Sequence, residues 1–521
     1  MLLLSLLLAT ASAAPEHVFD GAISADLRHG AITEHEALWL SYLQMFEPDE
    51  LPDQYREERY GWLCGTVVVQ QLSLHWDEFT PAEQNRINRV ITPRHGNLGA
   101  AFDAHPAPPP ASDICWGRQG QNVFRSEHFQ IEYDGGFSQS QADGFARAFE
   151  TSYDTELGAG WREPDGMDRY LLQVYVQPNN GWAGGYTSIS GCGQTLMPYI
   201  VVGSGSFFGT WFNTLAAHEF NHASQYAYGF GNQFWFWEAT ATYVEESVYP
   251  SRNDWADPIE SGFSSNPWVG MHASDQDDQT IFWHMYGMSV WNFYLDEHYG
   301  GSDFVLQMWE ESEKFDVSPS DPYVLTQDEI FESMGYDFEE AYEGFIVNNV
   351  VMDFREQDDF AAVAIEDEID RLPDDAESDP DTSPQSRGQN YWWFDPDEAN
   401  NEFPDLVVNF DGDRDGEWVA YLVGVEDDQV VDQVRFVLED EEGTARLEDI
   451  EQFDDVYMVV SPMVIDDVPD EQYEYDWEAD VSEKLKGSGL LGLGVCGCSS
   501  GTSTGGWLLL VMPLLLLRRK R

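Results

Sequence analysis

Apolar residues in the first two thirds of the chain recur with helical spacing in some segments and alternate with polar residues in others. Residues Ala31–Phe46 carry apolar side chains every three or four positions behind a Thr33 to Glu36 capping box, which predicts a helix. The alternation in EHFQIEYD, which starts at Glu127, predicts a strand. The same patterns predict two further strands, at Tyr170–Val176 and Tyr199–Val202. They also predict three helices, at Ser140–Glu156, Trp235–Ser247 and Thr280–Tyr299. This mixture predicts an α+β domain over residues 119–356.

The pattern changes after residue 356, where charged residues replace the apolar periodicity. Residues 357–388 are dense in Asp, Glu, Pro and Ser, a composition typical of a solvated linker. Short apolar runs such as WVAYLVGV and VYMVV then follow one another over residues 389–467, separated by turn residues. That spacing predicts a small β-sandwich. Residues 468–487 are again acidic and are predicted to form a spacer.

One turn in the second half resembles the start of a calcium loop. Asp411, Asp413 and Asp415 occupy alternate positions of DGDRDGEW. The twelfth position is Leu422 rather than a bidentate Glu, so the segment does not fit an EF-hand. We expect an acidic hairpin turn here instead.

The composition is that of a folded and very acidic protein. The 521 residues fit two or three domains, and a hydrophobic content of 42% excludes global disorder. Against 25 Lys and Arg stand 95 Asp and Glu, which gives a net charge of −70. Because this charge repels phosphate, we expect no nucleic-acid partner. We interpret the excess of acid as a surface adapted to salty surroundings, where salt screens charges beyond about 10 Å, rather than as a feature with an acid-specific function.

A Pro-rich break, AHPAPPPAS at residues 104–112, separates the predicted α+β domain from what precedes it. The region before it, residues 14–118, is predicted to be helical. Two roles remain open for this region, a prosegment that is removed on maturation and a permanent helical subdomain.

The first residues have the pattern of a secretory signal peptide. Residues 1–13 read MLLLSLLLATASA, a Leu-rich run followed by small residues, and cleavage is expected after Ala13. The protein is therefore predicted to be exported.

The last residues, 488–521, combine Cys496 and Cys498 with an apolar stretch, Trp507–Leu517, and a basic tail. Eleven residues of helix span only about 16 Å, about half of a bilayer core. The arrangement resembles the myxosortase-type (MYXO-CTERM) sorting signal of surface proteins. That resemblance implies transient membrane association, processing at the Cys region by a sorting protease, and a place at the cell envelope or outside the cell. An ordinary tail-anchor helix is the alternative.

Three cysteines belong to the body of the chain, Cys64, Cys115 and Cys192. An odd number in an exported protein is most simply one disulfide and one free or buried thiol. The sequence does not decide which two cysteines pair.

The motif HEFNH, His218 to His222, supplies the strongest chemical signal. It lies in a run without Pro or internal Gly, so it is predicted to be helical. Residues four apart share one helix face, so His218 and His222 can bind one Zn²⁺ while Glu219 remains free to act as a base. A metal would also compensate the cost of placing these polar groups on a core-facing stripe.

Sixteen residues beyond His222, Glu238 lies in the segment WEATATYVEE at the start of another predicted helix. It resembles the E-G-x-A-x-Y-x-E segment of gluzincin metallopeptidases, with Ala239 in place of the Gly. The resemblance implies that Glu238 is the third metal ligand. Glu245 and Thr242 are two candidates for orienting a histidine ring by a hydrogen bond to its second nitrogen.

A wider resemblance covers more than half of the chain. The order HFQIEYD, LLQVYV, YIVVGS, HEFNHASQY, WEATATYVEE and YGMSVWNFYLDEHYG is similar to the catalytic region of a family of secreted myxobacterial metalloproteases. The helix ALWLSYLQMF and the sequence Cys64-Gly65-Thr66 resemble that family's N-terminal region. The resemblance implies a zincin-like fold and a zinc peptidase of gluzincin type.

Peptide hydrolysis also needs a donor for the oxyanion of the transition state. Tyr286 precedes Gly287 in WHMYGMSVWNFYL and resembles the Tyr of gluzincin aminopeptidases, while His284 lies two residues earlier. An aromatic core helix without a catalytic role is the alternative for both residues.

These signals together predict an exported zinc metallopeptidase that acts on peptides or proteins, with Glu219 as general base. The alternative is a noncatalytic surface adhesin or binding protein built on a metallopeptidase scaffold, in which the metal is retained for structure. Peptide turnover distinguishes the two.

Overall fold

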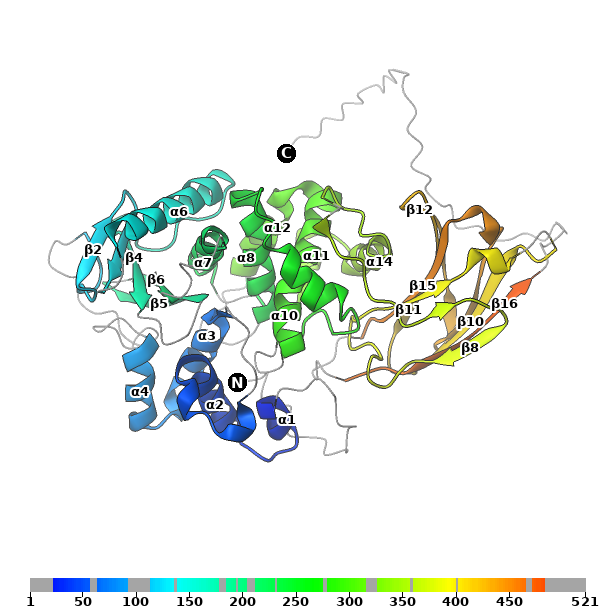
Figure 1. The fold of residues 1–521 in the computed structure, drawn as a ribbon, viewed down its shortest axis with the longest axis horizontal. Helices are drawn as coiled ribbons and strands as arrows, with labels where there is room; N and C mark the ends of the chain where they lie inside the picture. The colour runs from blue at the N-terminus through cyan, green and yellow to red at the C-terminus, as the bar shows by residue number, and fades with distance from the viewer. Residues whose placement is uncertain are drawn as a thin grey trace, which may run out of the picture.

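The computed structural model describes residues 22–56, 63–91, 113–134, 138–177, 184–193, 195–203, 211–229, 232–274, 279–314, 326–356, 359–399, 402–464 and 471–482. Several predicted features lie outside them: the signal peptide at 1–13, the Pro-rich break at 104–112, and the C-terminal signal at 488–521 with Cys496 and Cys498. A mixed sheet with helices forms one end of the molecule, a helical layer the middle, and a β-sandwich the other end (Figure 1). The predicted α+β class is confirmed.

The N-terminal helices are short and pack together below the mixed sheet in Figure 1. Thr33 caps the second of them, and the predicted capping box with Glu36 is present. These helices are α1 Ala22–Arg28, α2 Glu34–Phe46, α3 Thr66–Leu74 and α4 Pro81–Ile91.

The described residues place six strands in the mixed sheet, in the order β1-β5-β6-β4-β3-β2. These strands are β1 Leu63–Cys64, β2 Asn122–Arg125, β3 Phe129–Tyr133, β4 Leu172–Gln177, β5 Gly184–Cys192 and β6 Thr195–Gly203. The three predicted strands correspond to β3, β4 and β6. β3, β4 and β6 run parallel, β5 is antiparallel to β6, and β1 pairs with β5 in parallel.

Both faces of this sheet are buried. Helices α6 (Gln139–Gly158) and α7 (Phe212–Gln225) cover one face, where Val174 and Ile200 belong to a shared apolar core. On the other face, Tyr186 and Tyr199 share a core with the apolar residues of α2 and α3. The N-terminal helices are therefore part of the hydrophobic core of the sheet.

The middle of the molecule is a layer of helices around one large aromatic core. The single helix expected near Thr280–Tyr299 is two helices in the structure: α10 ends at Gly287 and α11 begins at Ser289. A Cβ atom at Gly287 would lie 2.7 Å from the backbone nitrogen of Phe263, so the chain passes very close to its neighbour there. The layer contains α8 Phe234–Val248, α10 Gln279–Gly287, α11 Ser289–Leu295, α12 Ser302–Glu313, α13 Gln327–Met334 and α14 Phe338–Asn348.

In the described C-terminal part, two five-stranded sheets enclose one apolar core. Their orders are β13-β14-β10-β16-β8 and β12-β11-β15-β9-β7. The strands are β7 Glu368–Ile369, β8 Asp374–Glu377, β9 Asn390–Phe394, β10 Asp405–Gly412, β11 Trp418–Glu426, β12 Gln429–Arg435, β13 Val437–Glu439, β14 Glu442–Leu447, β15 Asp455–Pro462 and β16 Tyr475–Ser482.

Three of these strands lie in segments that the sequence analysis assigned to an acidic linker and an acidic spacer. β7 and β8 fall within residues 357–388, and β16 falls within 468–487. In β16, Tyr475, Trp477 and Ala479 are buried, and the acidic residues that alternate with them are exposed. The acid therefore covers the solvent face of a strand, and the sheets extend past the predicted limits of the sandwich.

The predicted hairpin turn at Asp411–Trp418 is wrong. β10 pairs with β14 and β16, whereas β11 pairs with β12 and β15, so this segment connects the two sheets. The indole of Trp418 donates a hydrogen bond to the Asp413 carbonyl at 2.9 Å and packs on Phe410. Burial of that indole in the shared core draws the chain across to the second sheet.

Polar contacts of the buried Arg387 join the sandwich to the helical layer. Arg387 forms a bidentate ion pair with Asp328, in which Nη1 and Nη2 lie 2.7 and 2.8 Å from the two carboxylate oxygens. The hydroxyl of Tyr342 donates a hydrogen bond to the Arg387 carbonyl at 2.5 Å. Across the described ranges, every helix is too short or too polar to traverse a lipid bilayer.

Cys115 and Cys192 form a disulfide. Within the described residues, Cys64 is the remaining cysteine and is a buried free thiol. This is the count of one disulfide and one thiol that the sequence predicts.

Candidate metal centre

Helices α7 and α8 bring the three predicted ligands together. The Nε2 atom of His218 lies 3.1 Å from Oε2 of Glu238, and Nε2 of His222 lies 3.5 Å from the same oxygen. All three side chains are at most 1% exposed. The spacing of four residues in α7 places both imidazoles on the face that α8 covers.

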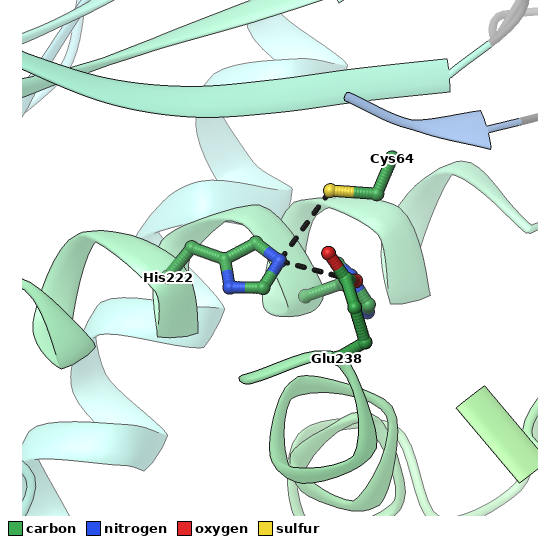
Figure 2. Close-up of side chains that lie close together, drawn as sticks. Cys64, His222 and Glu238 are labelled. Atoms are coloured by element: carbon green, nitrogen blue, oxygen red, sulfur yellow. Dashed lines mark hydrogen bonds and ion pairs between the residues drawn. The ribbon is translucent and has the colours of Figure 1, made fainter. Parts of the chain in front are cut away.

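A fourth donor comes from the N-terminal region. Cys64 ends the edge strand β1, and its Sγ atom lies 3.4 Å from Nε2 of His222 (Figure 2). The donor atoms of Cys64, His218, His222 and Glu238 all lie within 4.8 Å of one another. Bond lengths of about 2.0 to 2.3 Å place tetrahedral zinc ligands roughly 3.3 to 3.8 Å apart, so the cluster has suitable dimensions for one ion.

Sequence reasoning did not identify Cys64 as a donor. It precedes His222 by 158 residues, and no spacing rule links the two. Only the strand pairing between β1 and β5 brings its thiol to the helix that carries the motif.

Each imidazole is oriented by a hydrogen bond at its other nitrogen. Nδ1 of His218 lies 2.9 Å from Oε1 of Glu245, and Nδ1 of His222 lies 2.7 Å from Oε1 of Gln225. Such contacts direct both Nε2 atoms toward the common centre. The hydroxyl of Thr242 is buried and has no hydrogen-bond partner in the described part of the chain, so Glu245 holds His218.

Gln225 was not predicted, although it lies three residues after His222 on the same helix. Its amide nitrogen donates to the side-chain oxygen of Asn221 at 2.9 Å and to the Trp237 carbonyl at 3.1 Å. Asn221 in turn donates to the buried carboxyl of Glu156 at 3.1 Å. This network locks the amide that orients His222.

Glu219 lies beside the cluster and is held by β5. The Thr187 hydroxyl lies 2.8 Å from both Oε2 and the backbone carbonyl of Glu219. A Cβ atom at Gly185 would lie 2.4 Å from Oε1, so the strand approaches the carboxyl group closely. Oε1 is buried, and no described residue forms a hydrogen bond with it. This oxygen is the one that could accept a proton.

Burial and charge act against each other in this site. Burial would lower the pKa of His218, but hydrogen bonds with Glu238 and Glu245 raise it to about 10. Burial would raise the pKa of Glu238, but His222 and His218 lower it to about 2. For Glu219 burial prevails over the two histidines, and its pKa is raised. The ionised form of Glu238 therefore depends on positive charge next to it.

The donor set fits a zinc ion. Imidazole nitrogen, carboxylate oxygen and thiolate sulfur are the ligand types that zinc binds in proteins. Oε1 of Glu238 is buried and has no hydrogen-bond partner among the described residues, as expected for an atom next to a cation site. A cation would supply the compensating charge in place of a protonated imidazole.

Tyr286 lies at the cluster and His284 does not. The ring of Tyr286 stacks on that of His218 with centroids 5.7 Å apart. Its pKa is raised well above the usual value by burial and then by Glu238, Cys64 and Glu219. Burial is the main cause that lowers the pKa of His284 to about 3, and His272 adds to it, while the backbone at Gly270 and Gly262 acts in the opposite direction.

Comparison with protein-family models and with curated proteins found no match for this chain. Its function must therefore be argued from the site itself. What the geometry establishes is a buried group of two histidines, a glutamate and a cysteine that could hold a metal ion.

Proposed function

We propose that the chain is a zinc metallopeptidase of gluzincin type that hydrolyses peptide bonds. The observation that carries the proposal is the division of roles in the cluster. His218, His222 and Glu238 direct donor atoms to one point, while Glu219, next to His218 in sequence, is held by Thr187 instead. Two histidines and a carboxylate are a ligand set of catalytic zinc sites. The resemblance to secreted myxobacterial metalloproteases agrees with this assignment.

Each residue then has a defined task. Zinc, when bound, polarises the scissile carbonyl and lowers the pKa of water toward about 7. Glu219 takes the proton of the attacking water on Oε1 and passes it to the leaving amine. The Tyr286 hydroxyl donates a hydrogen bond to the developing oxyanion. Glu245 and Gln225 keep the imidazoles in place throughout.

The proposal places this peptidase outside the cytoplasm. The disulfide between Cys115 and Cys192 supports an oxidising compartment. The predicted signal peptide and the predicted sorting signal at 488–521 agree with export to the cell envelope. Peptides or proteins encountered there would be its substrates.

One observation favours the noncatalytic alternative. With Cys64 included, the cluster offers four protein ligands, and all of them are buried. Closed four-ligand sites are typical of structural zinc. A surface binding protein stabilised by such a site would hold zinc and cleave nothing.

Digestion of a peptide library by the full chain, with zinc content measured in parallel, decides between the two functions. The wild type and Cys64→Ser should both be tested, because the thiol lies within the donor cluster. We expect cleavage that is abolished by chelation and restored by zinc, and Glu238→Ala should lose both zinc and cleavage. Zinc bound at about one per chain with no peptide cleaved by either form would overturn the peptidase function.

A further inference from the structure

We propose that Cys64 is the fourth ligand of the metal and holds the peptidase in a latent form, from which it is released when strand β1 leaves the edge of the sheet. The proposal rests on the proposed function, since it describes regulation of the same site. It assigns an inhibitory role to the end of β1.

The position of the thiol is the first observation. Cys64 is fully buried, and its sulfur faces His222 on the side where Glu238 also points (Figure 2). Catalytic zinc sites have three protein ligands and keep one position for water. With the thiol in that position, the site has four protein ligands and no place for the water that Glu219 would deprotonate.

The second observation is that β1 blocks the strand next to Glu219. Leu63 pairs with Gly184, and Cys64 pairs with Gly185, the residue that packs against the Glu219 carboxyl group. An exposed strand edge can bind an extended peptide by main-chain hydrogen bonds. β1 therefore occupies both the metal position and the strand edge that a peptide substrate could use.

The third observation is that β1 is a two-residue strand at the edge of the sheet. Beyond the two paired residues, the Gly65 amide donates to the Gly185 carbonyl at 2.8 Å, and the Thr187 amide donates to the Thr66 hydroxyl at 2.9 Å. The Cys64 sulfur lies 3.1 Å from the same hydroxyl. Helices α2 and α3 are anchored separately by the apolar core on the sheet. In the proposed opening, these contacts of β1 break while the apolar core of α2 and α3 stays packed.

The exchange balances as a ligand replacement. On closing, the Cys64 S–H bond breaks and its proton goes to solvent, the bond between the metal and its water breaks, and a sulfur–metal bond forms. On opening, the sulfur–metal bond breaks, the sulfur takes up a proton from water, and the fourth position passes to solvent. No oxidant or reductant is needed.

Cobalt(II) bound to the full chain in place of zinc reports the thiolate directly, since a sulfur ligand gives a charge-transfer absorption that nitrogen and oxygen ligands do not. We expect this absorption in the wild type and its loss in Cys64→Ser at equal cobalt content. Replacing Cys115 and Cys192 by Ser is the matched control, and the absorption should persist. Zinc-edge X-ray absorption on the wild type needs no variant and should find one sulfur at about 2.3 Å.

Peptide cleavage per bound metal should be at least about tenfold higher in Cys64→Ser than in the wild type, because a larger fraction of molecules is competent. Absence of the sulfur signal in the metal-loaded wild type would overturn the inference and leave the proposed function standing. A sulfur signal with equal cleavage by both forms would overturn the latent switch. A sulfur signal with no cleavage by either form would overturn the proposed function, and the switch with it.

Discussion

Each ring nitrogen of the two histidines has its own task, and the residues that hold the outer nitrogens determine how well the inner ones bind metal. Glu245 contacts Nδ1 of His218, and the competing candidate Thr242 contacts no described hydrogen-bonding group. Removing the outer contact should loosen the ring and reduce its basicity.

We therefore expect Glu245→Ala to lower zinc affinity by about 10- to 100-fold, measured by competition with a chromogenic chelator. Thr242→Ala is the matched control on the same helix and should leave the affinity within about twofold. Equal losses in the two variants would show that helix packing, rather than the Glu245 contact, controls the affinity.

The charge on His218 predicts a pH dependence for the metal-free protein. Burial opposes its charge, yet Glu238 and Glu245 raise its pKa from 6.5 to about 10. A raised pKa stabilises the fold fully below about pH 6.5, and this contribution disappears as the pH rises through about 10. The thermal midpoint without metal should therefore fall between pH 6.5 and 10, and fall less steeply in His218→Asn.

Zinc should reverse this trend, because it binds the neutral imidazole. The increase in thermal midpoint on adding zinc should be larger at pH 8 than at pH 6. A zinc effect that is independent of pH would mean that the histidines are not ligands.

At the residue scale, the sequence predicted what a fixed spacing can encode. His218 and His222 lie four apart on one helix, and Glu238 lies in a segment with a recognisable pattern. Cys64 and Thr187 come from strands far away in the chain, and only the sheet pairing brings them to the site. Gln225 could have been predicted from the sequence, because a residue three positions beyond His222 lies on the same helix face.

At the element scale, β5 is the strand on which the site depends, and the sequence did not predict it. Its residues, GGYTSISGC, are all buried, so they show no alternation of apolar and polar positions. The sequence analysis also missed β16, because its exposed acidic residues dominate its composition and make it resemble a spacer. In both strands the burial pattern depends on neighbours that the local sequence does not reveal.

β5 approaches Glu219 closely enough for a single methyl group to disturb it. A Cβ atom at Gly185 would lie 2.4 Å from Oε1 of Glu219, so Gly185→Ala should displace the carboxyl group. We expect cleavage to fall by about 10² or more while zinc stays near one per chain, as judged by metal analysis and peptide assay.

Gly144→Ala is the matched control, since Gly144 lies inside α6 with open space around it and its nearest neighbour is an arginine nitrogen at 3.9 Å. It should retain cleavage and be slightly more stable, because alanine suits a helix interior better than glycine. Full cleavage by Gly185→Ala would show that Glu219 does not need its present position.

At the scale of the whole molecule, charge repulsion opposes folding. A net charge of −70 over 521 residues keeps the protein soluble but raises the energy of the compact state. Salt shortens the screening length from about 10 Å at 0.1 M to about 3 Å at 1 M. The fold should therefore be more stable in salt.

We expect the thermal midpoint to rise steeply with NaCl up to about 0.5 to 1 M and then to level off, as repulsion becomes screened. Sucrose at equal osmolality serves as a control for excluded-solute effects, which increase steadily with concentration. A midpoint that rises in proportion to NaCl without levelling off would contradict a screening mechanism.

The sequence predicted the organisation of the whole chain only in part. The described structure has helices before the mixed sheet and a sandwich after it, but α2 and α3 share a core with the mixed sheet. A Pro-rich break suggests a boundary in the chain, whereas apolar packing determines which parts fold together. The pairing of β1 with β5 brings Cys64 from this N-terminal region to the metal site.

The most direct test of the account compares peptide turnover per bound zinc in Cys64→Ser and in Cys64→Ser combined with Glu219→Gln. Both should bind zinc at about one per chain, because Glu219 is not a ligand. Turnover should fall by about 10² or more in the double variant, because glutamine cannot accept the proton of the attacking water. Equal turnover in the two proteins, or no turnover in either while both hold zinc, would contradict the account.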